Sequence, residues 1–154
     1  MKHLLISFMC VFVSNVWATE ATQSVSPKQS ITLDATQDFS VLNAGVVPYY
    51  IDKRNDALAI DARRVEFRNL FARATTTFTG PSTQYDVTLN YLTEEDGEPL
   101  YRLLINDQLV GTYRASYIGK GSSKDLQPNH HTWRNIALNS GDKIAIESAA
   151  HTNG

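Results

Sequence analysis

Cysteine is nearly absent from this sequence, since Cys10 is the only one among 154 residues. It lies in an N-terminal segment that we expect to be removed, so the mature chain should have no disulfide, thiol nucleophile or thiolate metal site. Stability must then come from a hydrophobic core. A mature chain of about 136 residues is long enough to form one domain with such a core.

Long apolar runs and blocks of one charge are absent too. The longest apolar run covers about ten residues, whereas a membrane-spanning helix needs about 20, so a membrane span is excluded. The formal net charge is −2, or −3 without Lys2, and no basic block occurs, which argues against nucleic acid or an anionic membrane as partner. No phosphate loop, serine nucleophile elbow or distinct pair of carboxylates is found, so we expect no enzyme activity.

The N-terminus has the pattern of a secretory signal peptide. Lys2 supplies a short positive region, an apolar region covers Leu4 to Val13, and Ala18 ends a stretch suited to cleavage. A lipoprotein attached at Cys10 is disfavoured, because the residues before it are bulky. We therefore predict a signal peptide at residues 1–18 and a secreted or periplasmic protein.

An antiparallel meander is the clearest structural signal. Apolar and polar residues alternate from Tyr85 to Tyr91, an acidic turn follows at Glu94–Gly97, and the alternation resumes from Tyr101 to Ile105. Asn106–Asp107 is a pair able to adopt the positive φ of a tight hairpin turn, after which Leu109–Tyr113 runs back. One face of this meander is apolar and must be covered by the other elements.

The rest of the chain predicts further short strands. Residues 19–30 read as a flexible lead-in, the segment Asp61–Ala74 is compatible with a helix or a strand with the strand favoured, and residues 115–130 form a long loop. The other expected strands are residues 31–33, 46–51, 58–60, 75–79, 131–138 and 143–148. We therefore predict an all-β domain at 31–154, an antiparallel β-sandwich of jelly-roll type with about eight strands.

The pattern resembles a known family, the secreted bacterial carbohydrate-binding modules with a galactose-binding-like jelly roll. The matching segments are Phe78–Gly80 leading into Tyr85–Val87, the turn Glu95–Gly97, the strand Tyr101–Asn106, and Trp133–Ile146 with Gly141–Asp142 in its turn. The resemblance covers about Ala57 to Gly154 and involves mostly scaffold residues, so it is more specific for fold than for ligand. It implies a non-catalytic module that accompanies polysaccharide-degrading enzymes.

One departure from the family concerns the last strand. Such modules usually continue after the stretch that matches Ala145–Ser148 with a closing strand near the N-terminal strand, whereas this sequence ends at Gly154. The sequence is then a fragment, or the closing strand comes from elsewhere in the chain. Without it, the domain would have an open sheet edge.

Aromatic and polar residues in the long loop and at strand ends are candidates for sugar binding. Sugars stack on flat aromatic faces, while polar side chains bind their hydroxyls. The candidate platforms are Tyr113, Tyr117 and Trp133, and the candidate polar partners are Asn129, His130, His131, His151 and Asn153. The alternative for both Trp133 and Tyr113 is a place in the core, which is favoured for Trp133 and left open for Tyr113, so Tyr117 is the better candidate for ligand contact.

Two segments are candidate metal sites, the acidic turn and the adjacent residues 130 and 131. The carboxylates Glu94, Glu95 and Asp96, with Glu98 nearby, could hold a structural calcium ion, because hard cations favour several oxygen ligands. The alternative is a solvated acidic turn in which Gly97 supplies a positive φ. Zinc at the adjacent residues 130 and 131 is disfavoured, because neighbouring side chains on a strand point to opposite faces.

Two functions follow as hypotheses. The first is a non-catalytic module that binds a polysaccharide or oligosaccharide. The second is a structural or adhesive β-sandwich that binds a protein partner through an open sheet edge. A small hydrolase or lyase is a third and weaker interpretation. Aromatic residues that meet in one concave site would favour sugar, and a flat apolar patch or open edge would favour protein.

Overall fold

The computed structural model describes residues 4–6, 9–14, 30–60 and 64–149, without the side chains of the first two segments. The strands are β1 (Leu4–Ile6), β2 (Met9–Ser14), β3 (Ser30–Asp34), β4 (Tyr49–Asp52), β5 (Ala57–Ile60), β6 (Phe71–Thr77), β7 (Thr83–Leu92), β8 (Leu100–Ile105), β9 (Gln108–Arg114), β10 (Pro128–Leu138) and β11 (Lys143–Ala149). A single 3-10 turn, η1 (Val65–Phe67), is the helical element among the described residues. The prediction of an all-β chain is confirmed.

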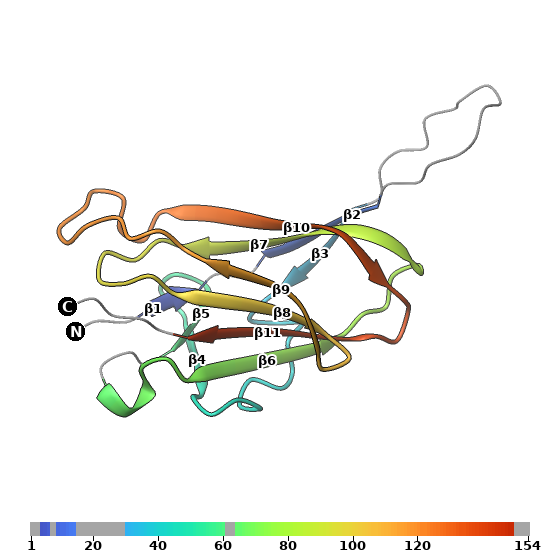
Figure 1. The fold of residues 1–154 in the computed structure, drawn as a ribbon, viewed down its shortest axis with the longest axis horizontal. Coiled ribbons are helices and arrows are strands. Elements are labelled where there is room, and N and C mark those ends of the chain that lie inside the picture. Colours follow the sequence, from blue (N-terminus) through green and yellow to red (C-terminus); the bar gives the residue numbers. More distant parts are fainter. Residues whose placement is uncertain (1–3, 7–8, 15–29, 61–63, 150–154) are drawn as a thin grey trace, which may run out of the picture.

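Two four-stranded antiparallel sheets form a sandwich (Figure 1). One has the order β10-β7-β2-β3 and the other the order β6-β11-β8-β9. A smaller sheet, β1-β5-β4, lies at one end. Within the described residues, no helix has the length and apolarity that crossing a membrane would need.

The three strands of the predicted central meander are present, but the prediction of one continuous meander was wrong, because β7 lies in one sheet and β8 and β9 lie in the other. Strands β7, β8 and β9 cover its three expected segments, and Asn106 and Asp107 have φ values of 50° and 66° at the β8–β9 hairpin. Two residues in the left-handed region match the twist of the flanking strands, which is why this turn favours Asn and Asp. The expectation for Gly97 was wrong, because it is not among the described glycines with positive φ.

The segment that was compatible with helix or strand divides into two. Residues 61–63 lie outside the described part, η1 follows, and the strand β6 starts only at Phe71. The strand predicted for residues 75–79 is the second half of β6, which ends at Thr77. The strand favoured for Asp61–Ala74 is therefore confirmed from Phe71 onward, and a short 3-10 turn precedes it.

The predicted signal peptide contributes two strands in this structure. β1 pairs with β5, and β2 lies between β7 and β3. Most of the predicted lead-in, residues 19–29, is outside the described residues, and β3 begins at Ser30. The strands predicted at residues 31–33, 58–60, 131–138 and 143–148 are confirmed as parts of β3, β5, β10 and β11, whereas the strand predicted at 46–51 begins only at Tyr49, in β4.

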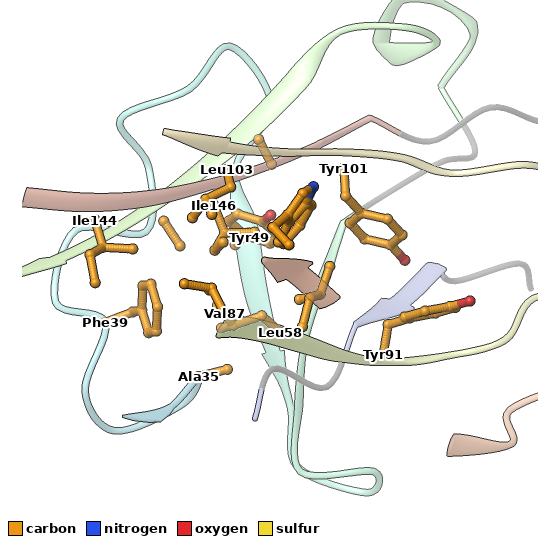
Figure 2. Close-up of a cluster of buried hydrophobic side chains, with 14 of the residues drawn as sticks. Ala35, Phe39, Tyr49, Leu58, Val87, Tyr91, Tyr101, Leu103, Ile144 and Ile146 are labelled. Atoms are coloured by element: carbon orange, nitrogen blue, oxygen red, sulfur yellow. The ribbon is translucent and has the colours of Figure 1, made fainter. Parts of the chain in front are cut away.

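The core lies between the two four-stranded sheets. Figure 2 shows Tyr49 of β4 between Leu103 and Ile146 of one sheet and Val87 of the other. All four side chains are at most 4% exposed. The Tyr49 hydroxyl is 2.6 Å from Ser148 Oγ, so a polar pair is enclosed in an apolar core. Burial raises the Tyr49 pKa above its ordinary value, and the hydroxyl stays protonated.

We expect the Tyr49–Ser148 pair to contribute to stability as a unit. Tyr49→Phe leaves the Ser148 hydroxyl without this bond, and an unsatisfied buried group costs about 1–3 kcal/mol. The double variant Tyr49→Phe/Ser148→Ala should lose less free energy of unfolding in urea than the sum of the two single variants. Tyr117→Phe, on an exposed ring, is the control, and additive losses would contradict this expectation.

Candidate functional site

Two connections meet at one end of the sandwich. The acidic turn, residues 93–98, joins β7 to β8, and loop 115–127 joins β9 to β10 (Figure 1). The β8–β9 hairpin lies at the opposite end. The C-terminal ends of β7 and β9 both lie at this end. Side chains from two distant parts of the sequence therefore come close together there.

Thr93 holds loop 115–127 against the acidic turn. Its N–H donates to Gln127 O at 3.0 Å, its carbonyl accepts from Leu126 N at 2.8 Å, and its Oγ1 accepts from Gln127 N at 3.0 Å. The same hydroxyl contacts Lys124 O. The C-terminal part of the loop is therefore fixed by backbone as well as side-chain bonds.

Two carboxylates extend this attachment. Asp125 Oδ1 accepts from Glu95 N at 3.1 Å, and Glu95 Oε2 accepts from Gly121 N. Gly121 has a φ of 74°, a conformation that glycine adopts without steric cost. These bonds cross between the turn and the loop in both directions. We call the whole set, together with those of Thr93, the loop clamp.

Glu94 and Asp96 are buried under the clamp, with 8% and 9% exposure. Burial raises the Glu94 pKa to about 9, and the hydrogen bond to Asp96 and the negative charges of Asp96, Asp125 and Glu95 act in the same direction. Near neutral pH, Glu94 is therefore protonated and can donate this hydrogen bond to Asp96. Burial also raises the pKa of Asp125.

Tyr117 lies in loop 115–127 and is 44% exposed. It is the most exposed of the Phe, Tyr and Trp side chains in the described part of the chain. Its hydroxyl accepts a hydrogen bond from Lys120 N at 3.1 Å. The ring is thus attached to a loop that is itself attached to the acidic turn, and Tyr117 remains the strongest candidate for stacking on a ligand.

The other two predicted platforms are part of an aromatic column that joins β9 to β10. The Tyr113 ring is parallel to His131 at 4.0 Å between centroids and to Tyr101 at 6.2 Å. His131 meets Trp133 edge to face at 4.9 Å. Tyr113 also shares a 2.7 Å hydroxyl contact with Tyr91. Because His131 stacks on the Tyr113 ring and Tyr91 and Tyr101 pack around it, the face that His131 covers is not free for a sugar.

Trp133 is 7% exposed and packs directly on the backbone of β9. A Cβ at Gly111 would lie 2.4 Å from Trp133 Cδ1, so only glycine leaves room for the ring. The indole Nε1 donates to Thr112 O at 3.4 Å. Trp133 is therefore a core residue, the alternative that the sequence favoured, and its ring is not exposed as a platform.

The polar candidates do not gather at one place. Asn129 and His131 lie opposite Tyr91 and Leu89 of β7, on the face toward the core, whereas His130 lies opposite Asn90 on the outer face. Burial and the neighbouring His130 lower the pKa of His131. His151 and Asn153 lie outside the described residues. The sequence placed these side chains together by their position in strand ends, but strand alternation separates them.

Side-chain geometry does not support a calcium site. Among the described residues, no group of three or more His, Cys, Asp or Glu side chains is arranged to hold a metal ion. Calcium at Glu94, Glu95 and Asp96 stays a prediction without structural support. The alternative of a solvated turn was wrong for Glu94 and Asp96, which are buried.

The sequence analysis did not identify Thr93, Gly121 or Asp125 as residues of the site. Asp125 stands in a Ser- and Lys-containing loop with no local pattern around it. Its partner Glu95 is 30 positions away in the chain. The length of the loop was the available signal, because long ordered loops in compact domains often carry function.

Comparison with known proteins gives one partial match. A stretch of 83 residues, 54% of this chain, is 30% identical to a protein of Formosa agariphila named "Uncharacterized protein P23". The match spans a fifth of the length of that protein. No family model and no solved structure matches the chain. The resemblance to carbohydrate-binding modules therefore stays a prediction from the sequence.

Enlarging Gly111 should destabilise the protein through Trp133. We expect Gly111→Ala to reduce the free energy of unfolding by about 1–3 kcal/mol, the usual cost of overpacking a filled site. Thr112→Ala, at the exposed neighbouring position, is the control for a change in the same strand. Adding Trp133→Leu should recover part of the loss, and a double variant that simply adds both losses would contradict the contact.

Glu94 should make stability decrease with rising pH. The unfolded chain releases this proton near the ordinary pKa of 4.5, and the folded chain keeps it to about 9. The contribution of Glu94 is therefore complete below pH 4.5 and is lost as the pH rises from 4.5 to 9.

Glu94→Gln, which cannot ionise, should flatten the decrease in urea unfolding free energy between pH 5 and pH 9. Glu66→Gln, at an exposed position in η1, should keep the wild-type pH dependence. If Glu94→Gln has the same slope as the wild type, Glu94 does not hold its proton in the folded protein.

Proposed function

We propose that this protein is a non-catalytic, secreted glycan-binding module whose sugar site lies at the end of the sandwich formed by the acidic turn and loop 115–127. One observation carries the proposal: the exposed Tyr117 ring belongs to a loop that the clamp holds in one conformation. A fixed aromatic ring loses little conformational entropy when it stacks on a sugar, which is what a binding platform requires. The jelly-roll resemblance and the predicted signal peptide agree with this assignment.

The polar groups around the loop suit sugar hydroxyls. Glu95 and Asp125 each use one carboxylate oxygen to accept a backbone N–H of the clamp. An ionised carboxylate has about four acceptor positions, so each retains some for a ligand hydroxyl. Asn129, at the start of β10, is exposed and close in sequence to the loop. An aromatic platform beside carboxylate acceptors is the combination that sugar recognition uses.

The aromatic column is excluded from this proposed site. Tyr113 and Trp133 are used to join the two sheets, and His130 is on the outer face of β10. The proposed site therefore excludes several of the candidate residues that the sequence suggested. It centres on Tyr117, Glu95 and Asp125.

The proposal is tested by screening the folded protein on an array of plant, algal and animal glycans, followed by calorimetric titration of the best ligand. We expect Tyr117→Ala to weaken binding about tenfold or more. The stacking of an aromatic ring contributes ~0.5–1.5 kcal/mol beyond its buried area, and about 1.4 kcal/mol corresponds to tenfold in Kd.

Leu109→Ala is the matched control, because Leu109 is also an exposed apolar residue but lies at the opposite end of β9. It should leave the affinity unchanged. A cooperatively melting protein that binds no glycan, or one whose affinity is indifferent to Tyr117→Ala, would contradict the assignment. Release of sugar products during the titration would instead favour the hydrolase or lyase interpretation.

A protein partner at a sheet edge is the second candidate. The observation in its favour is that β9 is an edge strand whose residues Leu109 and Val110 are 54% and 42% exposed. Exposed apolar residues on an edge strand favour pairing with another chain. Part of this edge is already covered, however, because Trp133 of β10 bonds to Thr112 O.

A further inference from the structure

The sheet β10-β7-β2-β3 depends on a strand from the predicted signal peptide. β2 pairs antiparallel with β7 through Val11–Ser14 opposite Tyr85–Thr88, and with β3 through Met9–Val13 opposite Ser30–Asp34. Among the described strands, β2 is the only one to which β3 is bonded. If the chain is cut after Ala18, as the sequence predicts, the middle of this sheet loses its strand.

β3 is held in place by contacts other than β2. Ile31 packs against Gly80, where a Cβ would lie 2.3 Å from Ile31 Cδ1. The chain that follows β3 is fixed by Ala35 and Phe39, which are 2% and 3% exposed in the main core. The backbone N–H of Asp38 also donates to Asp34 O at 2.8 Å. Loss of β2 would therefore leave β3 beside the core and open a gap between β3 and β7.

The gap has the width of one strand. Neighbouring strands are about 4.7–4.9 Å apart, so β3 and β7 lie about 10 Å from each other across β2. Both run antiparallel to β2 and hence parallel to each other. They could close the gap only by pairing in parallel, which would pull Ala35 and Phe39 out of the core. Closure is therefore opposed by the burial of these two residues.

We propose that in the processed protein the gap between β7 and β3 is a binding slot for an extended, uncharged apolar strand supplied by a partner polypeptide. The strand would run antiparallel to β7, in the register that β2 has in this structure. Backbone groups of Tyr85–Thr88 on one side and of β3 on the other would bind it, as in β-strand addition. The sequence of β2, MCVFVS, indicates the chemistry that the slot accepts: apolar and β-prone, without charge.

This inference is independent of glycan binding, because the slot lies within a sheet and Tyr117 lies in a loop at its end. A second copy of this chain and the chain's own leader are the other possible occupants, and the experiment distinguishes them.

The experiment begins with the full-length gene product secreted from a bacterial host. Intact mass shows whether residues 1–18 are removed, and hydrogen exchange then reports on the amides of Tyr85–Thr88. The probe is a synthetic peptide of residues 4–14 with Cys10→Ser and two added C-terminal lysines for solubility. The matched control peptide carries Phe12→Pro as well, because proline removes a ladder donor and disfavours a central strand.

We expect a processed monomer in which these amides exchange rapidly. The peptide should slow their exchange at least about tenfold and, at a hundredfold excess over its Kd, raise Tm by ~10 °C. The proline peptide should do neither. A processed chain that is unfolded alone and folds on addition of the peptide would give the same support.

Four results would overturn the proposal. A secreted protein that keeps residues 1–18 would make β2 a permanent strand. A processed monomer with slow exchange at Tyr85–Thr88 would show that the gap closes by itself. Protection that appears only in a dimer would make a second copy the occupant. An unfolded processed chain that the peptide does not rescue would show that no slot forms.

Discussion

The stacking of Tyr113 on His131, at 4.0 Å with the rings 7° from parallel, joins the two sheets at one side of their shared core. Tyr113 belongs to the edge strand of one sheet and His131 to the edge strand of the other. Trp133 strengthens the same junction by packing on Gly111 and is buried there, while Tyr113 and His131 are half-buried. Because these aromatic residues pack against one another, the ligand contact that we propose involves residues in the loop between β9 and β10.

The junction lies close to the clamp. Tyr113 stands near the end of β9 and His131 near the start of β10, and the loop between these strands returns across the end of the sandwich toward the acidic turn. Thr93, Glu95 and Asp125 then bind it with hydrogen bonds. Keeping Glu94 protonated lets a group of carboxyls remain close together, since a neutral carboxyl does not repel its neighbours. The packing of the aromatic rings, the hydrogen bonds of loop 115–127 and the protonation of Glu94 thus all stabilise the same end of the sandwich.

Local patterns in the sequence were sufficient for the strands and the tight turn. Alternation along β7 and β8 and the left-handed pair Asn106–Asp107 depend on neighbouring residues, so they could be predicted. The burial of Trp133 could not, because it depends on Gly111 in the other sheet. The clamp joins Glu95 to Asp125, which lie far apart in the sequence, so no local pattern could predict their contact. The burial of Glu94 could not be predicted for the same reason. Residues 130 and 131 follow the strand alternation that the sequence does predict, and it places them on opposite faces.

The most direct test of the account is where a ligand perturbs the protein. A two-dimensional NMR titration of isotope-labelled protein with its best-binding oligosaccharide would report this residue by residue. The account predicts shifts concentrated in loop 115–127 and the acidic turn, with Tyr117, Glu95 and Asp125 among the largest, and little change at Trp133. Shifts centred on Tyr113, His131 and Trp133 would contradict it, because they would show that the sugar binds at the aromatic column and that the column is open in solution.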